Sequence, residues 1–455
     1  MELLPLEIMA EVCSFSDFGS LKKIRLVSTA FAQIAPRYLF EEIYVTLIPE
    51  YLDKLTEVAI HPTLRFHVRT LFFDYDILNE EFAEYDVWKA EVDSGGPISI
   101  GGGPGAEVNA PADLDCSHQN FCRLLSSQKA LFDGRMDLEF LIAAFALLPN
   151  LRDIYSMAMQ SSTTPYYSIR RRKNGMDPVL SALQRDTLLP KPFVDTSVST
   201  QTGLSRPLAS LLSGLGLTRK QIYSIVVADI AWSFWKQDGP SGFQHVGQEL
   251  IDAAFQQLKN MYVILVVDAY DLEVRLQGML PLSISTFIGA AKRLQWLTLE
   301  FGCYAKDEDG AGFDNNIATR SPRAGQLFAK LTLPCLVTLH FGNCILTEEI
   351  LIGFMKRHST TLKYLHLVEV DLDNQSMEST SWAETLKQIA PILALETVNL
   401  LALRSDDIEN VIVADTNGEA CNSRVDAYCK GLTRFLRNRG QTGCPRILDF
   451  AAPTG

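Results

Sequence analysis

The chain has 455 residues and a formal net charge of −13, because 54 acidic residues outnumber 41 lysines and arginines. Apolar residues make up 47% and charged residues 21%, which indicates a folded chain with a sizeable core and excludes disordered, collagen-like and charged coiled-coil proteins. Since so acidic a surface repels phosphate backbones, we expect no nucleic-acid partner.

The first 45 residues are predicted to form a compact helical domain. Apolar residues recur at helical spacing in two stripes, which are Ile8, Val12 and Phe15, and then Ile24, Val27, Phe31 and Ile34. Pro5 suits a first helical turn, Pro36 is expected to end the second helix, and a short third helix or turn follows over 38–40. Three short helices cannot bury so many large apolar side chains among themselves, so part of this surface needs a partner.

A strand pattern with apolar residues at positions 1, 4 and 6 recurs along the remaining chain. Matches begin at Val68, Leu151 (with Ser156 in the third place), Ile222, Met261, Leu294, Leu336, Leu362 and Leu395. Helix-like stretches lie between most of them, and strand-then-helix units that repeat in this way favour an irregular leucine-rich-repeat solenoid of the α/β class. Such a solenoid is curved, with strands on the concave face and helices outside. The alternative is an ordinary α/β domain whose buried strands share the pattern.

These patterns predict three parts of the chain. A helical domain over 1–45 precedes a repeat domain over 46–420, and a C-terminal helix (Val425 to Arg437) and tail occupy 421–455. Long loops are expected at about 86–115, 161–202 and 306–323, where glycine, proline or polar residues gather.

The nine cysteines and the apolar stretches bear on the compartment. No C-x-x-C pair is present, which favours neither a disulfide framework nor a zinc site and suits a reducing compartment. The first residues do not look like a signal peptide. Phe140 to Leu148 is shorter than the ~20 apolar residues of a membrane helix. We therefore expect a soluble protein of the cytoplasm, the nucleus or both, with no membrane partner.

The opening segment resembles the F-box, a helical motif. The matching stretches are Leu4-Pro5-Leu6-Glu7-Ile8, Leu21-Lys22-Lys23-Ile24-Arg25-Leu26-Val27-Ser28, Phe31 and Ala35-Pro36-Arg37-Tyr38-Leu39-Phe40. The whole chain is similar to fungal F-box proteins with a degenerate leucine-rich-repeat body. It departs from the motif at Thr29, where a basic residue usually follows Val-Ser, and at Phe15, where a leucine-like residue is common.

The resemblance implies a substrate-recognition adaptor of an SCF-type cullin–RING ubiquitin ligase. The F-box would dock on the ligase adaptor subunit, and through it on cullin, while the repeat body would bind a protein substrate. By matching position, the adaptor-facing residues are Leu4, Pro5, Ile8, Val12, Leu21, Ile24, Leu26, Val27, Phe31, Leu39 and Phe40. On the strand face, the expected substrate contacts are Trp296, His340, Tyr364 and His366. The alternative is a protein-interaction scaffold outside any ligase that uses the same surfaces.

No catalytic residue, cofactor or metal site is predicted. The chain lacks a phosphate-binding loop, a nucleophile elbow and a paired-histidine metal motif. Asp307-x-Asp309 begins like a calcium loop, but the later ligand positions do not fit. His340 and His366, at equivalent places in consecutive strands, are expected to be exposed and non-catalytic. An enzyme with its site in the repeat body remains a third hypothesis without a nucleophile–base pair to support it.

Overall fold

The computed structural model describes residues 4–94, 114–157, 183–184, 186–189, 192–193, 205–235, 243–268, 282–304, 324–372, 382–401, 403 and 430–438. Over these residues the fold is mixed α/β, and within each of its two units the strands pair in parallel with their neighbours in chain order. The chain divides into two compact units, Met1–Ile222 and Tyr223–Gly455.

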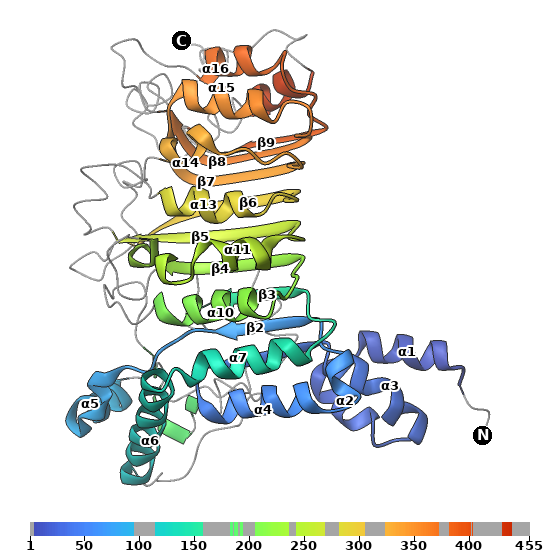
Figure 1. Cartoon of the computed structure of the whole chain (residues 1–455), viewed down its shortest axis with the longest axis vertical. Coiled ribbons are helices and arrows are strands. Elements are labelled where there is room, and N and C mark those ends of the chain that lie inside the picture. The colour runs from blue at the N-terminus through green and yellow to red at the C-terminus, as the bar shows by residue number, and fades with distance from the viewer. Residues whose placement is uncertain are drawn as a thin grey trace, which may run out of the picture. The chain divides into compact units, whose positions relative to one another are not determined.

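Three helices open the first unit, and we call residues 4–40 the N-terminal helical segment (Figure 1). They are α1 (Leu6–Phe15), α2 (Phe18–Ile24) and α3 (Thr29–Leu39). Asp17 caps α2 by accepting a hydrogen bond from the Ser20 backbone N–H at 2.9 Å. The three helices share a small core of four buried residues, which are Cys13, Leu21, Ala35 and Leu39.

Two predictions about this segment are wrong. The stripe from Ile24 to Ile34 is not one helix, because the Ser28 side chain accepts a hydrogen bond from the Phe31 N–H at 3.3 Å and starts a new helix there. Pro36 lies inside α3 and does not end it. The proline stands in the last turn, where its missing N–H removes one bond, and its carbonyl still accepts from the Phe40 N–H at 3.0 Å.

The rest of the first unit alternates strands and helices. Its elements are β1 (Glu42–Thr46), α4 (Pro49–Ile60), η1 (Leu64–Phe66), β2 (Thr70–Asp74), η2 (Glu80–Ala83), α5 (Tyr85–Ser94), α6 (Leu114–Asp133), α7 (Met136–Leu147), β3 (Asp153–Met157) and α10 (Ser205–Leu217). Strand β2 lies between β1 and β3, so that Leu71 is in register with Ile43 and Ile154. Strand β1 was not predicted, and it starts within the range assigned to the helical domain.

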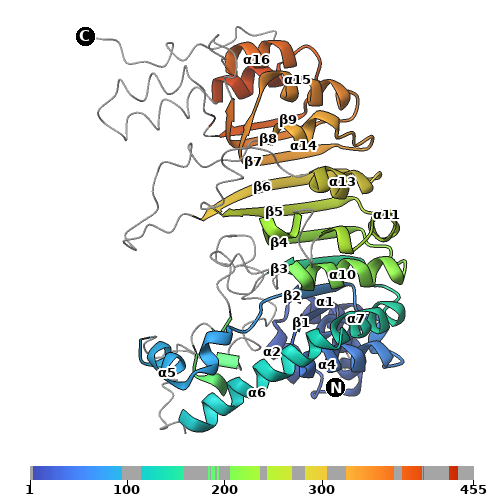
Figure 2. The same ribbon diagram turned by 60° about the vertical axis from the view of Figure 1, so that its left-hand side comes forward.

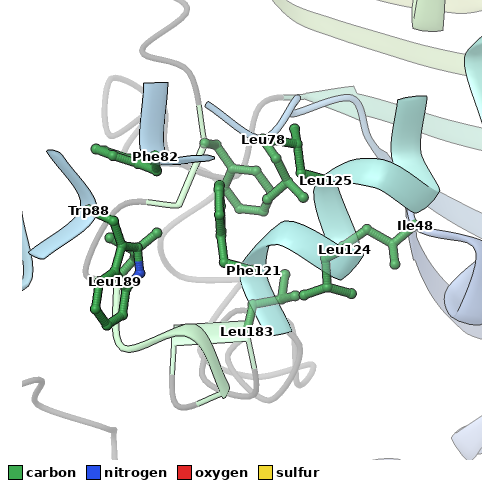
Figure 3. Packing of buried hydrophobic residues seen from close by; sticks show 10 residues of the cluster. Ile48, Leu78, Phe82, Trp88, Phe121, Leu124, Leu125, Leu183 and Leu189 are labelled. Atoms are coloured by element: carbon green, nitrogen blue, oxygen red, sulfur yellow. The ribbon is translucent and has the colours of Figure 1, made fainter. Parts of the chain in front are cut away.

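Helix α5 occupies the start of the loop predicted at about 86–115, and that part of the prediction is wrong. Trp88 holds this helix against the rest of the unit. Its side chain is fully buried, and its indole N–H donates to the Thr187 carbonyl at 3.1 Å. It belongs to a core cluster in which Phe121 and Leu125 of α6 meet residues distant in the sequence, such as Leu189 (Figure 3). The buried side chain of Gln128 connects α6 to the segment after β2, because its carbonyl oxygen accepts a hydrogen bond from the Leu78 N–H at 2.9 Å.

The second unit repeats strand and helix. Its elements are β4 (Ser224–Ala231), η4 (Trp232–Trp235), η5 (Phe243–His245), α11 (Gln248–Phe255), β5 (Asn260–Asp268), α13 (Leu282–Ala290), β6 (Trp296–Tyr304), α14 (Gly325–Lys330), β7 (Thr338–Leu346), α15 (Glu348–Arg357), β8 (Tyr364–Leu372), α16 (Trp382–Ile389) and β9 (Thr397–Leu401). Within this unit the helices α11, α13 and α15 lie along one face of the strands (Figures 1 and 2). A last helix covers 430–437, within the predicted C-terminal helix.

The predicted strand pattern coincides with buried positions that are in register from strand to strand. The shared row runs through Ile225, Met261, Leu297, Leu339, Leu365 and Val398. Met261 therefore takes the second place of the pattern and not the first, so the match in β5 begins at Leu258. The predicted start was three residues too late. The stretch from Met261 to Val267 is almost continuously apolar, so the spacing of its apolar residues does not fix the register.

Several predictions fall on parts of the chain outside the described residues. These are the loop at 306–323, most of the loop at 161–202, the stretch 95–113 of the first loop and the start of the C-terminal helix.

Candidate functional site

Large apolar side chains are exposed on the N-terminal helical segment. We call this set the apolar surface, and its members are Leu4, Pro5, Leu6, Ile8, Val12, Phe15, Leu26 and Val27. Three side chains are almost entirely open, with exposed fractions of 83% for Phe15, 79% for Leu26 and 72% for Val27. No described residue covers these three side chains, and large apolar residues that gather in the open on one small segment are typical of an interaction surface.

The local structure explains why these side chains remain open. Met9 and Cys13 form the buried stripe of α1, and Ile8 and Val12 stand one position before each of them, beside that stripe. The turn between α2 and α3 is fixed by backbone bonds, in which the Val27 N–H donates to the Ile24 carbonyl at 2.9 Å. Its side chains therefore point away from the small core.

The predicted adaptor-facing residues divide into three groups. Leu4, Pro5, Ile8, Val12, Leu26 and Val27 are exposed, whereas Ile24, Phe31 and Phe40 are half-buried against the core of the helical segment. Leu21 and Leu39 are core residues, with exposed fractions of 4% and 6%, and the prediction that they face a partner is corrected. Both residues belong to the cluster through which the three short helices pack together, and their side chains are used there.

Sequence reasoning missed two exposed residues of the apolar surface. Phe15 belonged to the predicted helical stripe and was set aside as a departure from the motif, yet it is the most exposed large apolar residue of the described chain. Leu6 begins α1 and is also exposed. Its spacing of three from Met9 and seven from Cys13 places it on their stripe, so the sequence pattern gave no signal that Leu6 would be exposed.

A cavity of about 200 Å³ lies beside this segment. Its lining includes Cys13, Phe18, Tyr38 and Glu42. Burial raises the pKa of the Cys13 thiol, so the side chain stays protonated near neutral pH and is a poor nucleophile. The cavity therefore gives no support to thiol chemistry.

The second unit presents polar and aromatic side chains on the strand face, the side of β5 to β8 opposite the buried leucines. The side chains of this face that we discuss are Tyr262, Trp296, Thr298, Glu300, His340, Tyr364 and His366. Alternation along each strand places them there, because Leu297, Leu339 and Leu365, at the intervening positions, are fully buried. The register aligns Trp296 with Thr338 and Tyr364, and Thr298 with His340 and His366.

All four predicted substrate-contact residues lie on the strand face, but with different exposure. Trp296 is 53% exposed, and its indole N–H donates to the Thr298 hydroxyl at 3.0 Å. Tyr364 is half-buried and donates to the Glu396 carboxylate at 2.7 Å. His340 and His366 were expected to be exposed, and instead they are half-buried because their rings stack with centroids 5.8 Å apart and an interplanar angle of 15°.

Glu300 is the functional candidate that sequence reasoning missed. Its carboxylate oxygen Oε1 lies 3.6 Å from His340 Nε2, and it accepts a hydrogen bond from Tyr262. Gly342 is in register with Glu300 on β7, and a Cβ there would approach Glu300 Cγ to 3.2 Å. The glycine therefore lets the Glu300 side chain lie across the neighbouring strand toward His340.

Burial sets the charge of this group. It raises the pKa of Glu300, against the opposing effect of the hydrogen bond from Tyr262. It also lowers the pKa of His340 and His366, and for His366 the charge of His340 adds to the effect. Both imidazoles are therefore neutral near pH 7 and do not balance the carboxylate.

Among the described residues, no three histidine, cysteine, aspartate or glutamate side chains lie so that they could hold a metal ion. None of the helices that the structure describes combines the length and apolar character needed to cross a bilayer. No protein-family model matches the chain, and no curated protein matches it.

Proposed function

We propose that the chain is a substrate-recognition adaptor of an SCF-type cullin–RING ubiquitin ligase. The N-terminal helical segment acts as the F-box and docks on the ligase adaptor subunit, which links it to cullin. The strand-and-helix body acts as an irregular leucine-rich-repeat solenoid, and its strand face holds a protein substrate. Such a ligase works in the cytoplasm or the nucleus, where we place the chain.

One observation carries the proposal, namely the apolar surface. Phe15, Leu26 and Val27 expose most of their side chains, whereas only five residues of the segment are buried, which are Met9, Cys13, Leu21, Ala35 and Leu39. Protein–protein interfaces have such an apolar centre with a polar rim. Lys22 and Lys23 on α2 and Glu7 and Glu11 on α1 supply charged neighbours for that rim.

The proposed role requires no catalytic residue in this chain. A substrate held beside the ligase meets activated ubiquitin at a high effective concentration, and this proximity accounts for the rate of transfer. The role therefore needs no covalent chemistry from the protonated Cys13 thiol or from the Glu300 carboxylate.

Val27→Asp tests the proposal. Val27 is 72% exposed, so the substitution leaves the core intact, while a charge in the centre of an apolar interface lowers affinity for a purified ligase adaptor subunit by at least about tenfold. Ile60→Asp is the matched control, since Ile60 is 60% exposed at the end of α4, outside the apolar surface. It should bind like the parent chain.

The assay also separates the ligase from the scaffold. Immobilised parent chain that captures no adaptor subunit, or Val27→Asp that binds as well as Ile60→Asp, contradicts the docking assignment. Capture of the adaptor subunit without ubiquitin transfer to any co-purified protein, in a reconstituted ligase, would indicate a scaffold.

A further inference from the structure

On the strand face of the second unit, one carboxylate has no cationic partner among the described residues. Glu300 is half-buried, and among the described residues its partners are the Tyr262 hydroxyl and the His340 imidazole. Both are neutral near pH 7. A half-buried carboxylate without a cation costs free energy that a positively charged ligand group would recover.

The surroundings of Glu300 suit a flat cation. The two imidazole rings of His340 and His366 stack parallel to each other and offer a planar edge beside the carboxylate. Trp296 lies on the same face of the same strand, four residues before Glu300, and its indole N–H donates to Thr298, which stands between the two. Guanidinium groups both pair with carboxylates in a bidentate manner and stack on aromatic rings.

We propose that Glu300, flanked by His340, His366 and Trp296, is a subsite for an arginine side chain in a basic segment of the bound protein. This inference rests on the proposed function, in which the strand face holds the substrate. It adds the chemical class of that substrate. The net charge of −13 favours the same class of partner, because an acidic protein attracts basic segments over a longer range.

The carboxylate of Glu396, which is in contact with Tyr364 of the strand face, does not compete for the same role. Glu396 is already paired with Lys363 at 2.6 Å and with Tyr364 at 2.7 Å. The chain itself thus neutralises the Glu396 carboxylate, whereas no lysine or arginine that the structure describes pairs with Glu300. The contrast singles out Glu300 as the acceptor for a cation from outside.

The test uses immobilised random peptides with one fixed central residue, which is arginine, citrulline or glutamate. Citrulline keeps the shape of arginine and removes its charge. The full chain should bind the arginine set about tenfold more tightly than the citrulline set, since a hydrogen bond to a charged group contributes that much. Glu300→Gln should reduce the ratio to less than about twofold while it retains the acceptor for Tyr262.

Glu249→Gln is the matched control, because Glu249 is exposed on α11, which lies on the opposite face of the strands. It should keep the preference of the parent chain. Equal binding of the arginine and citrulline sets, an unchanged ratio in Glu300→Gln, or a preference for the glutamate set overturns the inference. Capture of the ligase adaptor subunit, measured on the same preparations, reports separately on the proposed function.

Discussion

At the scale of single residues, His358 shows how burial fixes a protonation state. The side chain is buried at the end of α15, where Nε2 accepts from the Leu333 N–H at 2.9 Å and Nδ1 lies 2.8 Å from the Phe354 carbonyl oxygen. This pattern requires the neutral ring with its proton on Nδ1. Burial lowers the pKa of His358, the charge of Arg357 lowers it further, and the Phe354 carbonyl opposes the shift.

A pH dependence of stability follows from this lowered pKa. The unfolded chain takes up a proton at the ordinary histidine pKa of about 6.5, whereas the folded chain resists until a lower pH. The stabilisation by neutral His358 is thus complete above about pH 6.5, the unfolded pKa. It is lost as the pH falls from there toward the lower pKa of the folded chain. His340 and His366 have the same sign.

His358→Gln should therefore lower the free energy of unfolding by about 1–3 kcal/mol near neutral pH, because buried hydrogen bonds are lost. The difference from the parent chain should narrow as the pH is lowered below about 6.5, since only the parent loses the histidine contribution. Urea unfolding of both chains, near neutral pH and below about pH 6.5, measures this difference in the free energy of unfolding. A difference that stays constant or widens in acid would show that His358 does not titrate in this way.

At the scale of elements, the neighbouring strands β7 and β8 each contain one residue with a left-handed backbone conformation. Asn343 in β7 and Glu369 in β8 have positive φ angles of 57° and 53°, and the flanking pairs place them at the same level of the sheet. Asparagine tolerates the left-handed region, whereas glutamate pays a steric cost there. The same left-handed backbone position thus carries a suitable residue in one strand and an unsuitable one in the next.

Glu369→Asn should raise the free energy of unfolding by about 0.5–1 kcal/mol, because the left-handed backbone is less strained for asparagine. Glu369→Gln is the control: it removes the charge, keeps the side-chain length and should bring no such gain. Chemical denaturation of the three chains compares them. If the asparagine variant is no more stable than the glutamine variant, strain at this position is not limiting.

Elements with strong alternation could be predicted from the sequence, and others could not. The strands that begin near Leu297, Leu339 and Leu365 were located because each alternates apolar and polar residues over a buried face. The register of β5 was missed since its residues are apolar on both faces. The break between α2 and α3 depends on the Ser28 cap, which interrupts a stripe that looks continuous in the sequence.

The same limit applies to the candidate site. The places of Trp296, His340, Tyr364 and His366 on the strand face could be predicted because they alternate with buried leucines, while their role as substrate contacts stays a prediction. Glu300 was missed because its importance comes from Tyr262 and His340 on neighbouring strands, which a reading along one strand does not bring together. Leu21 and Leu39 were assigned to an interface because a motif match does not distinguish a core position from a surface one.

At the scale of the whole molecule, an adaptor must hold two partners at once. The apolar surface belongs to the first compact unit and Glu300 to the second. In the proposed function, the two binding steps therefore use different parts of the chain. Transfer of ubiquitin, however, needs both partners on the same chain.

This separation can be tested with Val27→Asp and Glu300→Gln in a reconstituted ligase, with an arginine-selected peptide fused to a lysine-containing reporter as substrate. Each variant should lose its own binding step and keep the other, and each should reduce ubiquitin transfer by about as much as it weakens binding, that is about tenfold. The double variant should combine both losses, since residues without shared partners act additively. Normal transfer by either single variant would mean that the chain does not work by joining two partners.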